Sequence, residues 1–397
     1  MSDVRRYNAE RASIADAVLH RVGGNRADVT AIVDEIAGTF SSPLYGATIA
    51  LLPHLLGAGF GGTFADRVEV TGDLAALREL STRATIILAP THSSNLDSIV
   101  LGVVTARAGL PPFAYASGRH IYRHRVFAQL MRRLGAYKLD PDRRDRLYLR
   151  IVNVYVNELL ARGYHSMIFP TGTRCRSGEV ESKVKLGLLG AAVHAPGPIA
   201  IVPVTINYQI VLEADHLIAY HLAGRSHERI VGDELFVRGR LLASAKRFAT
   251  LDQRVAIRFD EPIDPHAVQP WRSHLAAMLT AAYRCGTVFF PTHIVARALL
   301  DATDATDATA TIALEDAHRA IAKTCSLLAR SSALGTLWRA TTSLSDAGVL
   351  DAALRAWASW HPSPPIARVD DRIAITNRDL LLFYTNRTAH VSPPASR

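Results

Sequence analysis

Short apolar runs alternate with amphipathic stretches through the middle of the chain. The runs rich in β-branched residues predict buried strands at 84–89, 163–169, 199–208 and 255–259. Stretches with a helical period, such as 145–162, lie between them. The alternation predicts an α/β fold, with a mixed, largely parallel sheet flanked by helices on both faces and with N-terminal and C-terminal helical segments.

The two ends of the chain have patterns of their own. Residues 1 to about 35 predict one or two amphipathic helices. Three Asp-Ala-Thr repeats from Asp301 predict a solvated linker, and residues 312–360 beyond it are mostly helical in pattern. We therefore expect an N-terminal helical, membrane-associating segment at 1–70, a main domain at 71–300, the linker at 301–311 and a mainly helical C-terminal region at 312–397.

A long stretch without formal charge extends from Ile36 to Ala65. A membrane-spanning helix needs about 20 apolar residues, but prolines and glycines interrupt this stretch. We expect a broken helical hairpin that lies on or dips into a membrane surface, with a buried core segment and a true span as alternatives. Gly57–Gly62 matches G-x-G-x-x-G, but a helical pattern precedes it, so no dinucleotide site is expected.

Positive charge is concentrated in residues 119–150. This segment holds nine arginines and Lys138 against three aspartates, a net of +7 from the chain's +9. Such a surplus indicates an anionic partner: a phosphate, a lipid surface, an acidic carrier or nucleic acid. Thin aromatic interleaving and the lack of a known module argue against nucleic acid. His120 and His124 have a metal-like spacing, but no third ligand is evident, so no metal site is expected.

The first candidate for chemistry is the stretch from Pro90 to Asp97. Pro90 stops a predicted strand, His92 follows it, and the next three residues, Ser93 to Asn95, are good N-caps for a helix through Asp97. On a regular helix, five residues would separate the two side chains by about 140°, so the turn must bring them together. A His held by a carboxylate suits a general base, and simple helix capping is the alternative.

The second candidate is the loop from Thr171 to Gly178, which follows a predicted strand that ends at Pro170. Ligands of α/β sheets bind at the carboxyl ends of strands. Arg174 and Arg176 stand among glycines and hydroxyls there, and arginine binds phosphate through paired hydrogen bonds. We interpret the two arginines as uncompensated charges that need an anion; a flexible basic surface loop is the alternative.

Taken together and in order, four segments resemble the conserved boxes of the glycerophospholipid acyltransferase family, which includes glycerol-3-phosphate and lysophosphatidate acyltransferases. They are the His-x4-Asp box at His92–Asp97, then Gly135–Asp140, Phe169–Gly178 and Val202–Val204. The resemblance covers roughly residues 80–265. Phe383–His390 also resembles a segment of the glycerol-3-phosphate acyltransferase branch, which favours that branch.

Three features depart from the family pattern. Thr171 stands where many members carry Glu, and Cys175 where they carry Ser. Asp140, Pro141 and Asp142 separate the second box from Arg143 and Arg144. Thr171 is the best support for an alternative function, that of a catalytically weak or inactive lipid-binding, membrane-associated protein that keeps the fold.

The resemblance implies transfer of a fatty acyl chain in phospholipid biosynthesis. The donor would be an acyl thioester, either acyl-CoA or acyl carrier protein, and the acceptor glycerol-3-phosphate or 1-acylglycerol-3-phosphate. His92 and Asp97 would form the base dyad, and no metal or cofactor would be needed. The phosphate-binding residues would be Arg174, Arg176, Lys138 and Lys183, with Gly172 and Thr173 in an oxyanion loop. We expect a peripheral or monotopic protein on the cytoplasmic face of an anionic membrane, since three cysteines without CxxC spacing fit a reducing compartment.

Overall fold

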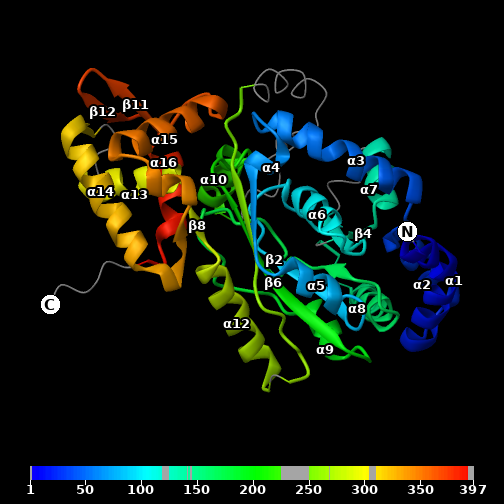
Figure 1. The fold of residues 1–397 in the computed structure, drawn as a ribbon. Coiled ribbons are helices and arrows are strands. Elements are labelled where there is room, and N and C mark those ends of the chain that lie inside the picture. The colour runs from blue at the N-terminus through cyan, green and yellow to red at the C-terminus, as the bar shows by residue number, and fades with distance from the viewer. Residues whose placement is uncertain are drawn as a thin grey trace.

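The fold is organised around a seven-stranded sheet (Figure 1). The computed structural model describes residues 2–118, 125–140, 142–143, 145–224, 250–267, 269–303 and 310–391. The strand order is β1-β7-β6-β2-β5-β3-β4, and all neighbours run parallel except β6 and β7. The strands are β1 (Val68–Thr71), β2 (Thr85–Pro90), β3 (Ala114–Gly118), β4 (Ala136–Leu139), β5 (Ser166–Met167), β6 (Ile199–Tyr208) and β7 (Val255–Phe259). The predicted mixed, largely parallel α/β sheet is confirmed.

Helices cover both faces of this sheet because successive strand residues point to opposite sides. Ile86 and Leu88 of β2 enter one hydrophobic core, and Ile87 and Ala89 enter the other. The first core is built with α5 (Leu74–Leu80), α6 (Asp97–Arg107), α10 (Ala214–Leu222) and the C-terminal elements. The second is built with α1 (Ser2–Val22), α2 (Arg26–Ile36), α8 (Arg146–Ala161), α9 (Leu189–Val193) and α12 (Trp271–Cys285).

The N-terminal segment forms helices, as its pattern predicted. The helices α1 and α2 pack on α8 through their apolar faces. The predicted broken hairpin is wrong, because α3 (Ser42–Gly59) is one helix that continues through Pro53, and the separate α4 (Phe64–Arg67) follows it. In the described parts of the chain, no helix has the length and apolar character needed to cross a membrane. The short α7 (Arg125–Arg133) begins beyond residues 119–124, which lie outside the described residues together with His120 and His124.

The C-terminal helices form a layer at the opposite end of the molecule from α1 and α2 (Figure 1). They are α13 (Pro291–Ala302), α14 (Leu314–Arg330), α15 (Asp346–Trp360) and α16 (Arg378–Thr385), and α13 packs on the other three. A small antiparallel sheet joins β9 (Thr311–Ala313), β12 (Arg372–Ile375) and β11 (Ile366–Val369). The remaining elements are β8 (Val288–Phe289), β10 (Thr336–Leu337), η3 (Ser332–Leu334), η4 (Arg339–Ser343) and η5 (Asn386–Thr388).

The predicted division into domains stays a prediction. Helix α13 runs past residue 300, where the main domain was expected to end, and its partners are the C-terminal helices. Residues 304–309, most of the expected linker, lie outside the described residues. The C-terminal helices contribute to the same hydrophobic core as Ile86 and Leu88 of β2, so the layer is packed on the sheet.

The C-terminal layer closely approaches the loop after β5 at Gly178. This glycine has φ +82°, and a Cβ placed on it would overlap the carbonyl oxygen of Phe383 in α16. Asn386 Nδ2 donates to the carbonyl oxygen of Ser177, one residue earlier, at 2.8 Å. A side chain at position 178 would therefore separate α16 from the loop that carries the two arginines.

We expect Gly178→Ala to destabilise the fold more than Gly197→Ala does. Gly197 is the matched control, because its φ is +89° and nothing lies within 4 Å of the added Cβ. Both changes force a left-handed backbone on alanine, but only the first adds an overlap, which costs about 1–3 kcal/mol more. Urea unfolding of the two variants measures this difference, and equal losses would contradict the close contact with α16.

Candidate active site

His92 lies in a turn directly after the carboxyl end of β2. Its Nδ1 is 2.7 Å from Oδ2 of Asp97, the first residue of α6. Asp97 is fully buried, whereas the His92 side chain is 23% exposed. The turn thus brings the two side chains together, as the spacing predicted. The expected serine or asparagine N-cap is wrong, because the N-cap residue is Leu96 and no side chain caps this helix.

The backbone of the turn is held by carboxylates at four consecutive amides. The amide of His92 donates to Glu181 Oε1 at 2.7 Å. The amides of Ser93 and Ser94 donate to Asp97 Oδ2 at 2.7 and 3.0 Å. The amide of Asn95 donates to Glu213 Oε1 at 2.8 Å, and Ser94 Oγ bonds Oε2 of the same carboxylate at 2.9 Å. Hydrogen bonds to ionised acceptors are stronger than neutral ones, so the turn is firmly fixed.

Two of these carboxylates, Glu181 and Glu213, were missed by the sequence analysis. Glu213 follows β6, which runs parallel to β2, and Glu181 follows the loop after β5, also parallel to β2. Their position after strands that end at the same edge of the sheet was the available signal. Each is buried, which distinguishes them from the many surface carboxylates of the chain.

The orientation of His92 fixes which of its nitrogens can act as a base. Three N–H groups converge on Oδ2 of Asp97, including that of the imidazole, which is the arrangement of an ionised carboxylate. Since a carboxylate can only accept, Nδ1 carries the hydrogen and Nε2 is left as the proton acceptor. The imidazole packs on the ring of Phe169, with centroids 4.3 Å apart. This contact joins the His92 turn to the loop that follows β5.

That loop carries the two predicted arginines, and they differ in environment. The amide of Cys175 donates to the carbonyl oxygen of His92 at 2.7 Å, so the loop is tied to the turn. Arg174 is 12% exposed and lies 3.8 Å from Glu213 Oε1. The expectation of two uncompensated charges is therefore wrong for Arg174. Arg176 is exposed, and its guanidinium lies over the ring of Tyr220, 5.0 Å from the centroid.

Other predicted site residues are less well placed. Lys138 lies on the edge strand β4, three strands from β2, and its Nζ bonds Glu35 at 2.5 Å. Lys183 is exposed, whereas Lys185 lies beside Gly172, with Nζ 3.7 Å from the position of a Cβ there. The amide of Gly172 already donates to the Phe169 carbonyl at 3.1 Å, so it is not available to an oxyanion in this conformation. Thr173 accepts a hydrogen bond from Thr171 Oγ1 through its carbonyl, at 2.9 Å.

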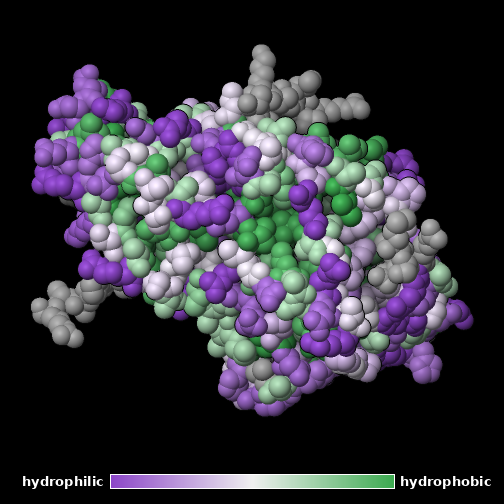
Figure 2. All heavy atoms as spheres, in the orientation of Figure 1, coloured by the Kyte–Doolittle hydropathy of each residue, from purple (hydrophilic) through white to green (hydrophobic). Residues whose placement is uncertain are grey.

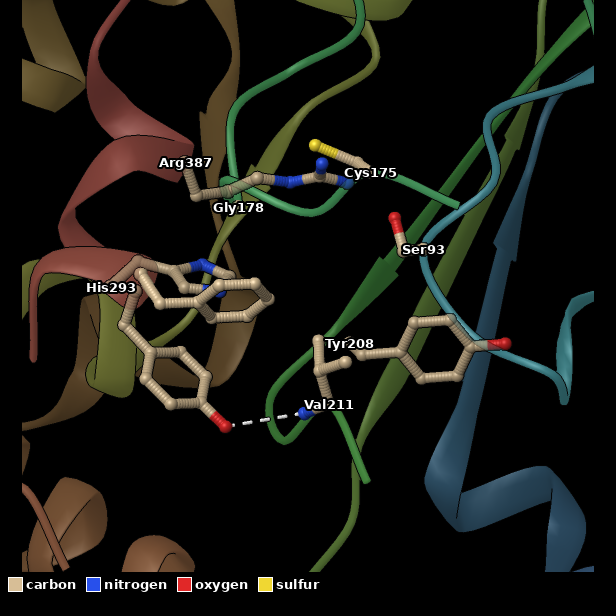
Figure 3. A pocket seen from close by; sticks show the side chains of 9 residues that line it. Ser93, Cys175, Gly178, Tyr208, Val211, His293 and Arg387 are labelled. Atoms are coloured by element: carbon tan, nitrogen blue, oxygen red, sulfur yellow. Dashed lines mark hydrogen bonds between the residues drawn. The ribbon is translucent and has the colours of Figure 1, made fainter. Parts of the chain in front are cut away.

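The C-terminal layer closes the site from the far side (Figure 3). Arg387 is buried, and its Nη2 donates to the Ile206 carbonyl at 3.0 Å and to Asn207 Oδ1 at 3.2 Å. Its side chain reaches toward Cys175 and Gly178 across a cavity of about 20 Å³. A cavity of that size has room for one water molecule. Its walls include Ser93, Cys175, Gly178, Tyr208, His293 and Arg387.

Burial sets the protonation of two groups around this cavity. Burial, reinforced by the Arg387 charge, lowers the pKa of His293 to about 3, so that ring is neutral at ordinary pH. Burial, reinforced by the Glu181 charge, raises the pKa of the Cys175 thiol. A thiol that resists ionisation is a poor nucleophile.

The chain is similar in sequence to known acyltransferases. Residues 67–207 match the family described as Acyltransferase. A glycerol-3-phosphate acyltransferase of Pseudomonas paraeruginosa is 27% identical over 251 residues, which cover 61% of this chain and 28% of that protein. One of Haemophilus influenzae is 31% identical over 184 residues, covering 45% of this chain and 22% of that protein.

The family match covers the part of the chain that carries the His92 turn. The family match contains His92, Asp97, Arg174 and Glu181, but ends before Glu213 and the C-terminal layer. The chain matches only between 22% and 28% of the length of these two relatives. The family match and the relatives together support the glycerophospholipid acyltransferase family, near its glycerol-3-phosphate acyltransferase branch.

Proposed function

We propose that the chain transfers a fatty acyl group from an acyl thioester to a hydroxyl of glycerol-3-phosphate or 1-acylglycerol-3-phosphate, in phospholipid biosynthesis. The observation that carries this proposal is the 2.7 Å bond between His92 and Asp97 in a turn whose amides are fixed by buried carboxylates. The names of the relatives support glycerol-3-phosphate as an acceptor. The donor is acyl-CoA or acyl carrier protein, and the reaction needs no cofactor besides this co-substrate.

The reaction runs through His92 Nε2 as general base. It removes the proton from the acceptor hydroxyl while the oxygen attacks the thioester carbonyl, and a tetrahedral intermediate forms. When the C–S bond breaks, the leaving thiolate takes the proton from the imidazolium. Asp97 keeps Nδ1 protonated and stabilises the positive charge that His92 carries between these steps. Transfer is direct, because the neighbouring Cys175 has a raised thiol pKa and is not activated.

The acceptor's phosphate binds at the loop after β5. Arg174 is the best placed cation, because its loop is tied to the His92 backbone through Cys175. A guanidinium has five donors, so Arg174 can contact Glu213 and a phosphate at the same time. Lys185 beside Gly172 and the exposed Arg176 add positive charge near the same loop. Lys138 lies on the edge strand β4 and bonds Glu35, so it is not part of this binding site.

The alternative is a lipid-binding, membrane-associated protein that keeps the fold without efficient turnover. Thr171 favours it, because this position carries no carboxylate and its hydroxyl is used inside the loop. Purified protein assayed with acyl-CoA and acyl carrier protein donors separates the two functions. Lipid binding without product from either donor would support the alternative.

Replacing His92 tests the base assignment. We expect His92→Ala to lower kcat by about 10²–10⁴-fold, the usual contribution of general base catalysis. The protein should stay folded, since the side chain is partly exposed. His221→Ala, at an exposed position on α10, is the control and should keep wild-type turnover. A His92→Ala variant that keeps more than a tenth of the activity would exclude the dyad as the base.

Replacing Arg174 tests where the phosphate binds. Arg174→Lys keeps a positive charge near Glu213 but loses the paired donors of the guanidinium. We expect the acceptor KM to rise about tenfold to a hundredfold, as for a charge-assisted contact of about 1.5–3 kcal/mol, with the donor KM nearly unchanged. Arg176→Lys is the control, and it should have a smaller effect because Arg176 lies exposed over Tyr220. If the donor KM rises instead, the site binds the donor's phosphates.

Attachment to an anionic membrane surface is part of the proposal. Leu51 and Leu55 lie one helical turn apart on α3 and are 63% and 67% exposed. Helix α3 carries no charged side chain, and Figure 2 shows hydrophobic surface over it. The amide of Ser41 bonds the Arg133 carbonyl at 2.8 Å, so the basic end of α7 adjoins the start of α3. Exposed leucines beside arginines suit the surface of an anionic bilayer.

We expect Leu51→Asp/Leu55→Asp to weaken binding to phosphatidylglycerol-containing vesicles by at least about tenfold, because burying one leucine contributes about 1.5–3 kcal/mol. The matched control is Leu344→Asp/Val369→Asp, at exposed apolar positions of the C-terminal region. Vesicle flotation measures both variants, with phosphatidylcholine vesicles for comparison. If the two double variants float equally well, α3 is not the membrane contact.

A further inference from the structure

We propose that Arg387, in the C-terminal layer, is a positioning residue for His92 and acts through the buried carboxylate of Glu181. This inference rests on the proposed acyl transfer and adds a link between the C-terminal layer and the base. Residue 387 is 295 positions from His92 in the sequence. The link runs from the guanidinium to the segment Glu179–Glu181 and from there to the His92 amide.

Glu181 is the first part of the link. Its Oε1 accepts the hydrogen bond of the His92 amide at 2.7 Å, so the carboxylate sets where the backbone of His92 lies. In the described part of the chain its Oε2 is buried without a hydrogen-bond partner. Burial raises the pKa of Glu181, the nearby Asp97 charge adds to that effect, and the Arg387 charge opposes it. A neighbouring cation therefore favours the ionised form of Glu181.

Arg387 supplies that cation and is itself fixed. Its Nη1 donates to the carbonyl oxygen of Glu179 at 3.4 Å, two residues before Glu181. Its Nη2 is held by the carbonyl of Ile206 and the side chain of Asn207 at the end of β6. The His293 imidazole, which lines the same cavity as Arg387, is neutral because its pKa is lowered to about 3. A buried arginine held at several atoms is expected to act as a fixed charge rather than a mobile one.

The consequence for catalysis follows from the position of His92. Without the Arg387 charge, the ionised form of Glu181 loses a stabilising interaction, and a carboxylate with less charge accepts the His92 amide bond more weakly. The imidazole then loses its fixed distance to the acceptor hydroxyl. A displacement of about 1 Å can lower the rate of a positioned reaction about 10²-fold. Substrate binding at Arg174 is not expected to change directly, because Arg174 pairs with Glu213.

The experiment is Arg387→Met in the full chain, with Arg297→Met as matched control. Arg297 bonds Thr388 Oγ1 and the Val391 carbonyl, so it holds the C-terminal segment that directly follows Arg387. We expect Arg387→Met to lower kcat about tenfold to a hundredfold, with both KM values within about threefold. Arg297→Met should keep kcat. A fall in kcat of the same size in both variants, or a rise in KM alone, would overturn the proposal.

Two more variants separate charge from folding. Arg387→Lys keeps the charge and should keep more of kcat than Arg387→Met, and it remains usable if the methionine variant fails to fold. Adding Glu181→Gln to Arg387→Met removes the unpaired carboxylate but keeps an amide oxygen for the His92 amide. We expect this double variant to regain at least about fivefold in kcat over Arg387→Met, as coupled positions do. Strictly additive losses would overturn the link through Glu181.

A readout without substrate distinguishes this proposal from the proposed function. The ring signals of His92 in NMR spectra, assigned by their loss in His92→Ala, report the position of the imidazole. We expect them to shift in Arg387→Met and to stay in Arg297→Met. If wild-type protein has no acyl transfer but these signals shift, the proposed function fails and the positioning link stands. Unchanged signals in folded Arg387→Met would overturn the link even if acyl transfer is confirmed.

Discussion

The candidate site depends on hydrogen bonds between four consecutive backbone amides and three buried carboxylates. The amides belong to residues 92–95, and the carboxylates to Asp97, Glu181 and Glu213. Each carboxylate comes from a different segment, so the turn can form only when α6, the loop after β5 and the end of β6 are all in place. A base that must remove a proton from a weakly acidic hydroxyl gains from such fixation, because no rearrangement is needed during the reaction.

Burying three carboxylates in one place is unfavourable unless cations accompany them. Arg174, near Glu213, and Arg387, near Glu181, provide two positive charges. The loop between residues 169 and 181 therefore has to approach both the turn and α16. This requirement explains why Gly178 stands where the Phe383 carbonyl leaves no room for a side chain. It also explains why a layer of helices outside the family match contributes to the site.

The sequence predicted those parts of the structure that depend on neighbouring residues. The strand that ends at Pro90, the return of Asp97 toward His92 and the N-terminal helices all follow from local pattern. The other residues of the site could not be predicted from local pattern. Glu181 and Glu213 contact the turn, and Arg387 contacts the carbonyl of Glu179, each across a long stretch of chain. Arg174 looked uncompensated for the same reason, since Glu213 is distant in sequence.

The error at α3 has a different origin. A proline removes one backbone hydrogen bond of a helix and usually kinks or breaks it. At Pro53 the helix continues, and the buried Gly57 at its end lies so close to the backbone of residues 62–64 that a Cβ would not fit. The helix is therefore held by packing against α4, which outweighs the local effect of the proline. Tertiary packing of this kind cannot be read from the residues around one proline.

The charges of the site also bear on how His92 works. Asp97, Glu181 and Glu213 carry three negative charges, and Arg174 and Arg387 carry two positive ones. One negative charge is left while His92 is neutral, and an imidazolium at His92 balances it. The buried carboxylates therefore support the role proposed for His92, in which the imidazole takes a proton from the acceptor hydroxyl. Thr171 and Cys175 do not disturb this balance, since both are neutral and hydrogen bond within their own loop.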